Sequence, residues 1–223
     1  MMKKSLLIGI VPIIAILLGA CTKEKLTGEG SIITENRTLL VLGGLKTVKV
    51  KGSTDVYVTQ GDEYKLEVKG YGNLVAALST DVKNNVLVLE FPNHYNVRND
   101  NTEIFLTIPH LPNLSINGSA DADVSGNFPD QPDLFFHVNG SAKINAGLIN
   151  VENLDVKING SGNLNVSNVM AENAHISISG SGKVKATVSD YLKASISGSG
   201  EISYSGDAVV ETQISGSGKV AKL

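Results

Sequence analysis

Apolar and polar residues alternate through most of the chain from about residue 39 onward. In the first half, Val48, Val50, Val56 and Val58 occupy alternate positions. This period of two is typical of β-strands that bury one face and expose the other. Glycine and asparagine residues separate these segments and predict turns. Only residues 73–79 have a pattern that would suit one or two helical turns.

The second half of the chain repeats a short motif, Ile-Asn/Ser-Gly-Ser-Gly/Ala followed by an apolar residue. The first glycine of each copy stands at positions 118, 140, 160, 180, 198 and 216, so the steps are 22, 20, 20, 18 and 18 residues. A period near 20 is typical of solenoids, in which each coil buries its apolar face against its neighbours. We therefore predict an all-β, β-helix-like β-solenoid with about 18–22 residues per repeat, with glycine at the corners because it tolerates positive φ. In this fold Ile158, Ile178, Ile196 and Ile214 would be buried directly above one another. The segment from Val50 to Val56 resembles the later repeat, so the first half could begin the same solenoid.

Polar residues of the repeats fall on outward-facing columns. One column contains asparagine or serine, and the next contains serine in every copy. Stacked side chains of this kind can hydrogen-bond from coil to coil and hold the register. The functional alternative is a polar stripe that meets hydroxyl-rich glycans, with candidate residues Asn139, Asn159, Ser161, Ser181 and Ser199.

The beginning of the chain has the pattern of a secretory signal. Lys3 and Lys4 precede an apolar run, Leu6–Leu18, that is too short to span a bilayer. The run ends in Leu18-Gly19-Ala20-Cys21, which resembles the lipobox of bacterial lipoproteins. That resemblance implies a signal peptide over 1–20, lipid attachment at Cys21 and a location on the outer membrane, with the periplasmic or extracellular face left open. An ordinary signal peptide with an incidental cysteine is the alternative. Residues 21–38 carry charges and glycines, and we expect a flexible tether there.

The segment 48–64, followed by serial Ile-Ser-Gly-Ser-Gly copies, resembles the DUF2807 family of autotransporter adhesin head GIN domains. The likeness covers about residues 40–220. It implies a solenoid of right-handed coils and an adhesin function with a glycan or protein ligand. We expect one domain over 39–223, with a strand-rich part at 39–110 and the Gly-Ser-Gly repeats at 111–223.

Charge and composition exclude several classes of function. The chain has a formal net charge of −3, which argues against nucleic acid as a partner. Its histidines show no metal-ligand spacing, and we expect no metal and no cofactor. The acidic cluster near the repeats is Asp121, Asp123, Asp130 and Asp133. We expect solvated carboxylates there, not a catalytic set.

The better candidate for binding is the loop Phe91–Asn101. Phe91, His94, Tyr95 and Arg98 gather there among polar residues, and aromatic and arginine side chains often dominate interfaces. The sequence therefore predicts a non-catalytic lipoprotein of the cell envelope or surface, an adhesin for glycan or protein. A carbohydrate-active β-helix enzyme and a structural envelope protein without a ligand are the alternatives.

Overall fold

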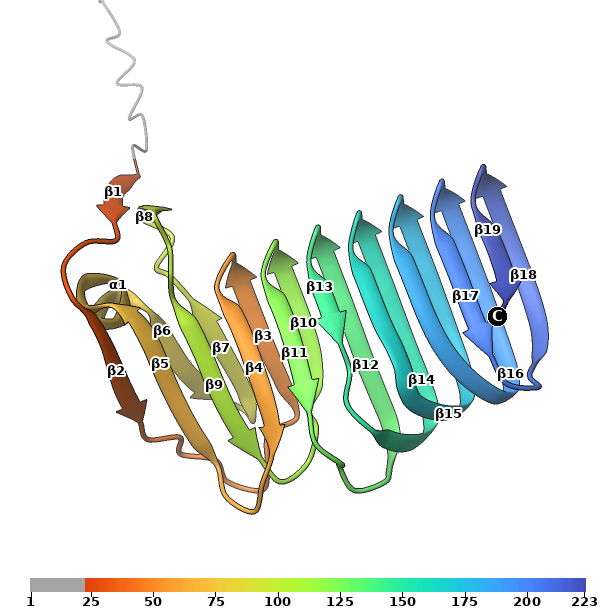
Figure 1. Cartoon of the computed structure of the whole chain (residues 1–223), viewed down its shortest axis with the longest axis horizontal. Helices are drawn as coiled ribbons and strands as arrows, with labels where there is room; N and C mark the ends of the chain where they lie inside the picture. The colour runs from red at the N-terminus through yellow and green to blue at the C-terminus, as the bar shows by residue number, and fades with distance from the viewer. Residues whose placement is uncertain (1–22) are drawn as a thin grey trace, which may run out of the picture.

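The computed structural model describes residues 23–223 of the chain (Figure 1). The signal peptide expected at 1–20 and the lipidation site expected at Cys21 lie outside the described residues. The elements are β1 (Glu24–Thr27), β2 (Ile32–Arg37), β3 (Thr47–Gly52), β4 (Asp55–Gln60), β5 (Lys65–Tyr71), α1 (Gly72–Ala77), β6 (Ser79–Lys83), β7 (Val86–Glu90), β8 (Tyr95–Arg98), β9 (Glu103–Ile108), β10 (Asn113–Gly118), β11 (Asp121–Ser125), β12 (Gln131–Gly140), β13 (Lys143–Asn145), β14 (Ile149–Gly160), β15 (Asn163–Gly180), β16 (Lys183–Gly198), β17 (Glu201–Ser205), β18 (Val209–Gly216) and β19 (Lys219–Lys222).

The strands form a β-solenoid, as the repeat predicts. From β10 onward each strand pairs in parallel with the strand one coil further on, and the register follows the motif: Gly118 pairs with Gly140, and Gly160 with Gly180. Strands β3 and β4 join the same ladders through parallel pairing with β10 and β11. The first half of the chain therefore begins the solenoid. Figure 1 shows the coils as a row of rungs along one rod.

The alternating apolar residues fill the narrow core between the faces of the rod. Ile158, Ile178 and Ile196 stack in register and are buried, which confirms the predicted column for these three. The prediction is wrong for Ile214, whose exposed fraction is 43%. Ile214 stacks on Ile196, but it belongs to the last coil, and no coil of the described chain covers its other side.

Glycine is required at the corner between the two main faces. Gly180 has a φ of +127°, and a Cβ built on it would lie 2.3 Å from the carbonyl oxygen of Gly160 in the preceding coil. That carbonyl oxygen accepts a hydrogen bond of 2.9 Å from the backbone N–H of Ser181. From Gly118 onward, each coil therefore turns so close to the preceding coil that no side chain fits at this position.

The beginning of the rod departs from pure parallel stacking. Strand β2 pairs antiparallel with β5, β5 pairs antiparallel with β9, and β6 pairs antiparallel with β7. Helix α1 lies where a helical turn was expected and buries Leu74 and Val75. We expected a flexible tether at 21–38, but the structure places strands β1 and β2 in that segment. Strand β1 is held by parallel pairing with β8, about seventy residues further on.

Within residues 23–223, no helix is long and apolar enough to cross a membrane.

Candidate functional site

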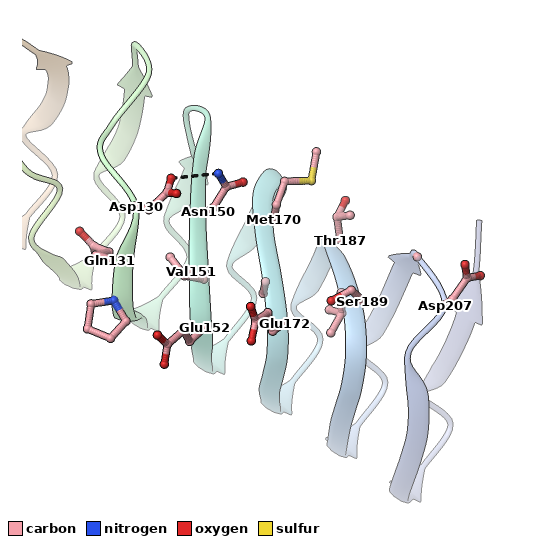
Figure 2. Close-up of a pocket in the computed structure, with 14 residues that line it drawn as sticks. Asp130, Gln131, Asn150, Val151, Glu152, Met170, Glu172, Thr187, Ser189 and Asp207 are labelled. Carbon is pink, nitrogen blue, oxygen red and sulfur yellow. Dashed lines mark hydrogen bonds between the residues drawn. The ribbon is translucent and has the colours of Figure 1, made fainter.

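A groove runs along the rod at the edge opposite the Gly-Ser-Gly corners (Figure 2). It encloses about 760 Å³ and is lined by segments 130–132, 150–152, 170–172, 187–189 and 206–207 of successive coils. At this edge the chain crosses from one main face back to the other. The register between β15 and β16 shifts there twice, between Val166 and Met170 and between Ala171 and Asn173. The later coils have 18 residues in place of 20, and the register shifts place this difference at the crossing.

The floor of the groove is apolar. Val151, Ala171 and Val188 follow one another in register on adjacent coils, and all three are buried. One rim is formed by Asn150, Met170 and Thr187, which also lie in register. Met170 points away from the ribbon in Figure 2, and its exposed fraction is 45%.

The other rim is acidic. Glu152 and Glu172 are exposed and lie on neighbouring coils, between register pairs that align Val151 with Ala171 and Asn153 with Asn173. Figure 2 shows both side chains on the same side of the floor. Within the described part of the chain, no ion pair includes either glutamate. Neighbouring strands lie about 5 Å apart, so the register brings the negative charges of Glu152 and Glu172 to the same rim, and like charges on adjacent strands repel one another. This rim therefore favours a ligand that carries positive charge.

The predicted binding loop is only partly assembled into a site. Phe91 and Tyr95 line a hollow of about 330 Å³ with Lys23, Lys51 and other residues. The His94 ring lies 4.0 Å from the Tyr95 ring, centroid to centroid. Three of the four predicted residues are thus neighbours, whereas Arg98 is exposed at the other end of β8 and does not line the hollow.

The predicted loop is also constrained more than its composition indicates. Tyr95 and Arg98 belong to β8, whose partner is β1, and the Glu24 N–H donates to the His94 carbonyl oxygen at 2.7 Å. Lys51 and Glu90 close the side of the hollow with an ion pair of 2.7 Å. This segment therefore fastens the start of the described chain to the rod.

The asparagine and serine stripe lies at the Gly-Ser-Gly corners. Asn139, Ser161, Ser181 and Ser199 are exposed, and Asn159 is half-buried. The hydrogen bonds between coils at these corners come from the backbone: each serine N–H donates to the glycine carbonyl oxygen of the preceding coil, as in the bond from Ser199 to Gly180 at 2.9 Å. The serine hydroxyl groups remain available on a flat edge, so a role in binding stays a prediction.

The acidic cluster is divided among three places in the fold. Asp121 and Asp123 lie on β11, Asp130 lies at the groove, and Asp133 lies in β12. Each of the four carboxylates contacts the residue 20 or 22 positions later: Lys143 at 3.2 Å, Asn145 at 2.6 Å, Asn150 at 2.9 Å and Asn153 at 3.1 Å, in that order. These aspartates therefore join successive coils and do not converge on a reacting centre.

One carboxylate, Asp55, lies in a crowded acidic row on the outer face. Asp121 and Glu103 are its neighbours on either side. Those neighbours are paired with Lys143 at 3.2 Å and Lys69 at 3.0 Å. Burial raises the pKa of Asp55, and the adjacent carboxylates act in the same direction, while the hydrogen bond from the Asp121 N–H opposes them. Two residues further along the same strands, Tyr57 of β4 stacks on Phe105 of β9 with ring centroids 5.1 Å apart. This cross-strand pair stabilises the sheet.

The described residues contain no group of three or more histidine, cysteine, aspartate or glutamate side chains placed to hold a metal ion. The fold and the groove define a class of protein: a β-solenoid with an extended groove across its coils. Rigid surfaces of this kind suit binding to long or flat partners.

The chain belongs to the DUF2807 family, described as "Putative auto-transporter adhesin, head GIN domain", which it matches over residues 44–168 and 134–208. A crystal structure of a "putative adhesin" from Bacteroides fragilis is similar, with 21% identity, a TM-score of 0.65, and coverage of 89% of this chain and 100% of that one. A "Putative lipid binding protein" from Parabacteroides distasonis has 22% identity, a TM-score of 0.59, and coverage of 90% and 100%. These similarities show the fold. No curated protein matches the chain.

Proposed function

We propose that this protein is a non-catalytic adhesin of the cell envelope that binds an extended, positively charged segment of a partner protein in its groove. The observation that carries the proposal is the apolar floor of Val151, Ala171 and Val188 beside the unpaired carboxylates of Glu152 and Glu172. An extended chain can follow a floor that repeats about every 4.8 Å. Its lysine or arginine side chains would relieve the repulsion between the two glutamates.

Membership of a family described as a putative adhesin supports the same class of function. A glycan is the second candidate ligand, because the serine hydroxyl groups and asparagine amides at the opposite edge can hydrogen-bond to sugar hydroxyl groups. The groove itself contains no aromatic side chain among its lining residues, and sugar sites usually offer a ring for stacking. For the groove we therefore favour the basic polypeptide.

The test is to measure binding of a lysine-rich decapeptide, a neutral decapeptide and a panel of polysaccharides by calorimetry. The double substitution Glu152→Gln and Glu172→Gln removes two rim charges and should weaken peptide binding about tenfold, equivalent to about 1.4 kcal/mol. Raising the salt concentration should weaken binding to the unsubstituted protein for the same reason. Asp133→Asn with Asp155→Asn is the matched control, since it removes the same charge from positions that do not line the groove. Equal losses in both double variants would show that only net charge matters and that the groove is not the site.

The non-catalytic assignment has its own test. Asp121 and Asp123 are occupied by contacts with Lys143 and Asn145, which leaves no free acid and base pair at the cluster that was the enzyme candidate. Incubation of the purified protein with the polysaccharide panel should release no reducing ends or unsaturated products. Turnover that disappears in the Asp121→Asn or Asp123→Asn protein would establish the carbohydrate-active alternative.

We also propose that a lipid on Cys21 anchors the protein to the outer membrane. The lipobox-like sequence at Leu18–Cys21 supports this. The pairing of β1 with β8 would hold the rod only a few residues from the anchor. Cys21→Ser should move the protein from the membrane fraction to the soluble fraction and abolish palmitate labelling, whereas Thr22→Ser should change neither. Membrane association that persists in the Cys21→Ser protein would contradict the anchor, and protease treatment of intact cells would assign the membrane face.

A further inference from the structure

The two ends of the rod are built differently. At the beginning, α1 and antiparallel strands close the core, and Arg37 donates hydrogen bonds to the carbonyl oxygens of Val75 at 2.5 Å and Leu78 at 2.6 Å. At the other end the last coil is β18 and β19 (Figure 1). Among the described residues, β18 pairs only with β16 and β19 only with β17. Each therefore presents one unpaired edge of backbone N–H and C=O groups.

The core is open at this second end. Every residue from Glu211 to Ser217 is exposed, although Thr212 and Ile214 stack on the buried residues Ala194 and Ile196 of the coil before. Val209, at the start of β18, has an exposed fraction of 71%. An open edge strand with apolar neighbours readily accepts another strand, and solenoids ordinarily need a polar cap at their ends.

We propose that the β18 end binds the same end of a second copy of this chain, with the two β18 strands antiparallel about a twofold axis at Thr212. In this register Val210 faces Ile214 of the other copy, so the inward apolar residues of both coils meet. Thr212 faces its own equivalent, a pairing in which threonine hydroxyl groups can hydrogen-bond. The alternating pattern of β18 is thus complementary to itself, as a twofold interface requires.

The charges near the end are compatible with this pairing. Glu211 is the one charged residue in β18, and in this register it faces Gln213 of the other copy, not a second glutamate. Within its own chain Glu211 accepts a hydrogen bond from the Tyr191 hydroxyl group and lies 3.9 Å from Lys193. Among the described strands, β2 at the beginning of the rod also leaves one edge unpaired, since it pairs only with β5. Attachment of β18 to that edge is less suitable, because β2 carries the charged residues Glu35 and Arg37 and is not complementary to the alternating pattern of β18.

The size of the end predicts a weak dimer. A strand of eight residues is roughly 26 Å long, and packed sheets lie about 10 Å apart. Each copy therefore contributes a few hundred Å² of surface, less than the interface of a stable complex, which buries about 1,200 Å² or more in total. We expect a dimer that forms at high protein concentration and dissociates on dilution.

The first experiment is sedimentation equilibrium of the purified full chain from about 10 μM to about 1 mM. The average mass should rise toward that of a dimer. Ile214→Lys places a charge at the interface and should keep the protein monomeric. Phe135→Lys is the matched control, because Phe135 is an apolar residue of similar exposure on the side of the rod, and it should leave the dimer intact. A monomer at every concentration, or growth beyond a dimer, would overturn the proposal.

The second experiment tests the register by disulfide formation. In the proposed pair the two Thr212 Cα atoms lie about 5 Å apart, whereas those of Gln213 lie roughly 8 Å apart, beyond the reach of a disulfide. Under mild oxidation Thr212→Cys should form a covalent dimer at least fivefold faster than Gln213→Cys, and Cys21 is common to both proteins. Equal rates would overturn the twofold register, and cross-linking only in the presence of another protein would show that a different partner covers this end.

Discussion

The corner glycines give a sharp test of how closely the coils are stacked. Gly180→Ala would keep a positive φ of +127° and place its Cβ 2.3 Å from the Gly160 carbonyl oxygen, far inside van der Waals contact. The positive φ alone costs about 1–2 kcal/mol for a residue with a Cβ. The clash adds to this, because the Gly160 carbonyl must move and so weakens its 2.9 Å hydrogen bond from Ser181, a loss of about 1–3 kcal/mol. We expect a total destabilisation of roughly 2–5 kcal/mol.

Gly52→Ala is the matched control. Gly52 occupies the same corner in an earlier coil and has a φ of +109°, but nothing lies within 4 Å of the position its Cβ would take. It should therefore lose only the backbone contribution of about 1–2 kcal/mol. Urea unfolding followed by far-UV circular dichroism measures both. With a urea dependence of about 2 kcal/mol per M, the clash contribution of about 1–3 kcal/mol should separate the two midpoints by roughly 0.5–1.5 M. Equal midpoints would show that the coils can separate at the corner without cost, and the close-stacking argument would be wrong.

Two further predictions concern the core and the acidic row. Ile178→Ala should lower the free energy of unfolding by about 2–5 kcal/mol, because Ile178 is fully enclosed. Ile214→Ala, measured at low micromolar concentration, should lower it by less than about 1 kcal/mol, because Ile214 is exposed. Similar losses for the two variants in urea unfolding would mean that the last coil is covered. Asp55→Asn keeps an acceptor for the Asp121 N–H and removes a carboxylate whose pKa is raised by burial. Because the folded state binds that proton more tightly, stability falls as pH rises from the ordinary pKa through the raised one. After allowance for solvent screening, the variant should gain on the order of 0.5 kcal/mol at pH 7 and nothing at pH 3, and a gain at both pH values would exclude the charge as its cause.

The fold was largely predictable because the sequence motif that forms each coil repeats along the chain. The Gly-Ser pair at each of the six corners reveals the coil length, and the alternating apolar residues assign the inward face. The exposure of Ile214 could not be predicted in the same way, because its local sequence equals that of Ile196. What differs is the number of neighbouring coils, which is a property of the whole rod.

The structure of residues 23–38 was missed for a physical reason. Strand β1 depends on β8, about seventy residues away, and a pairing of that kind leaves no local trace in a charged, glycine-containing segment. The groove did leave a trace in the sequence. The step between corner glycines falls from 20 to 18 residues after Gly180, and a shorter coil whose two main faces keep their register must lose residues at the crossing between them.

In a solenoid, the neighbour that decides the chemistry of an outward residue stands about twenty positions away along the chain. Asp121, Asp123, Asp130 and Asp133 form an acidic cluster along the sequence, yet each is satisfied by Lys143, Asn145, Asn150 or Asn153 on the next coil. Glu152 and Glu172 are twenty residues apart, and the register brings two negative charges together. Reading the sequence in columns of one coil length therefore separates carboxylates that join coils from carboxylates that remain available to a ligand. By that criterion we propose the groove rim, and not the cluster of aspartates, as the place where this rod recognises a charged partner.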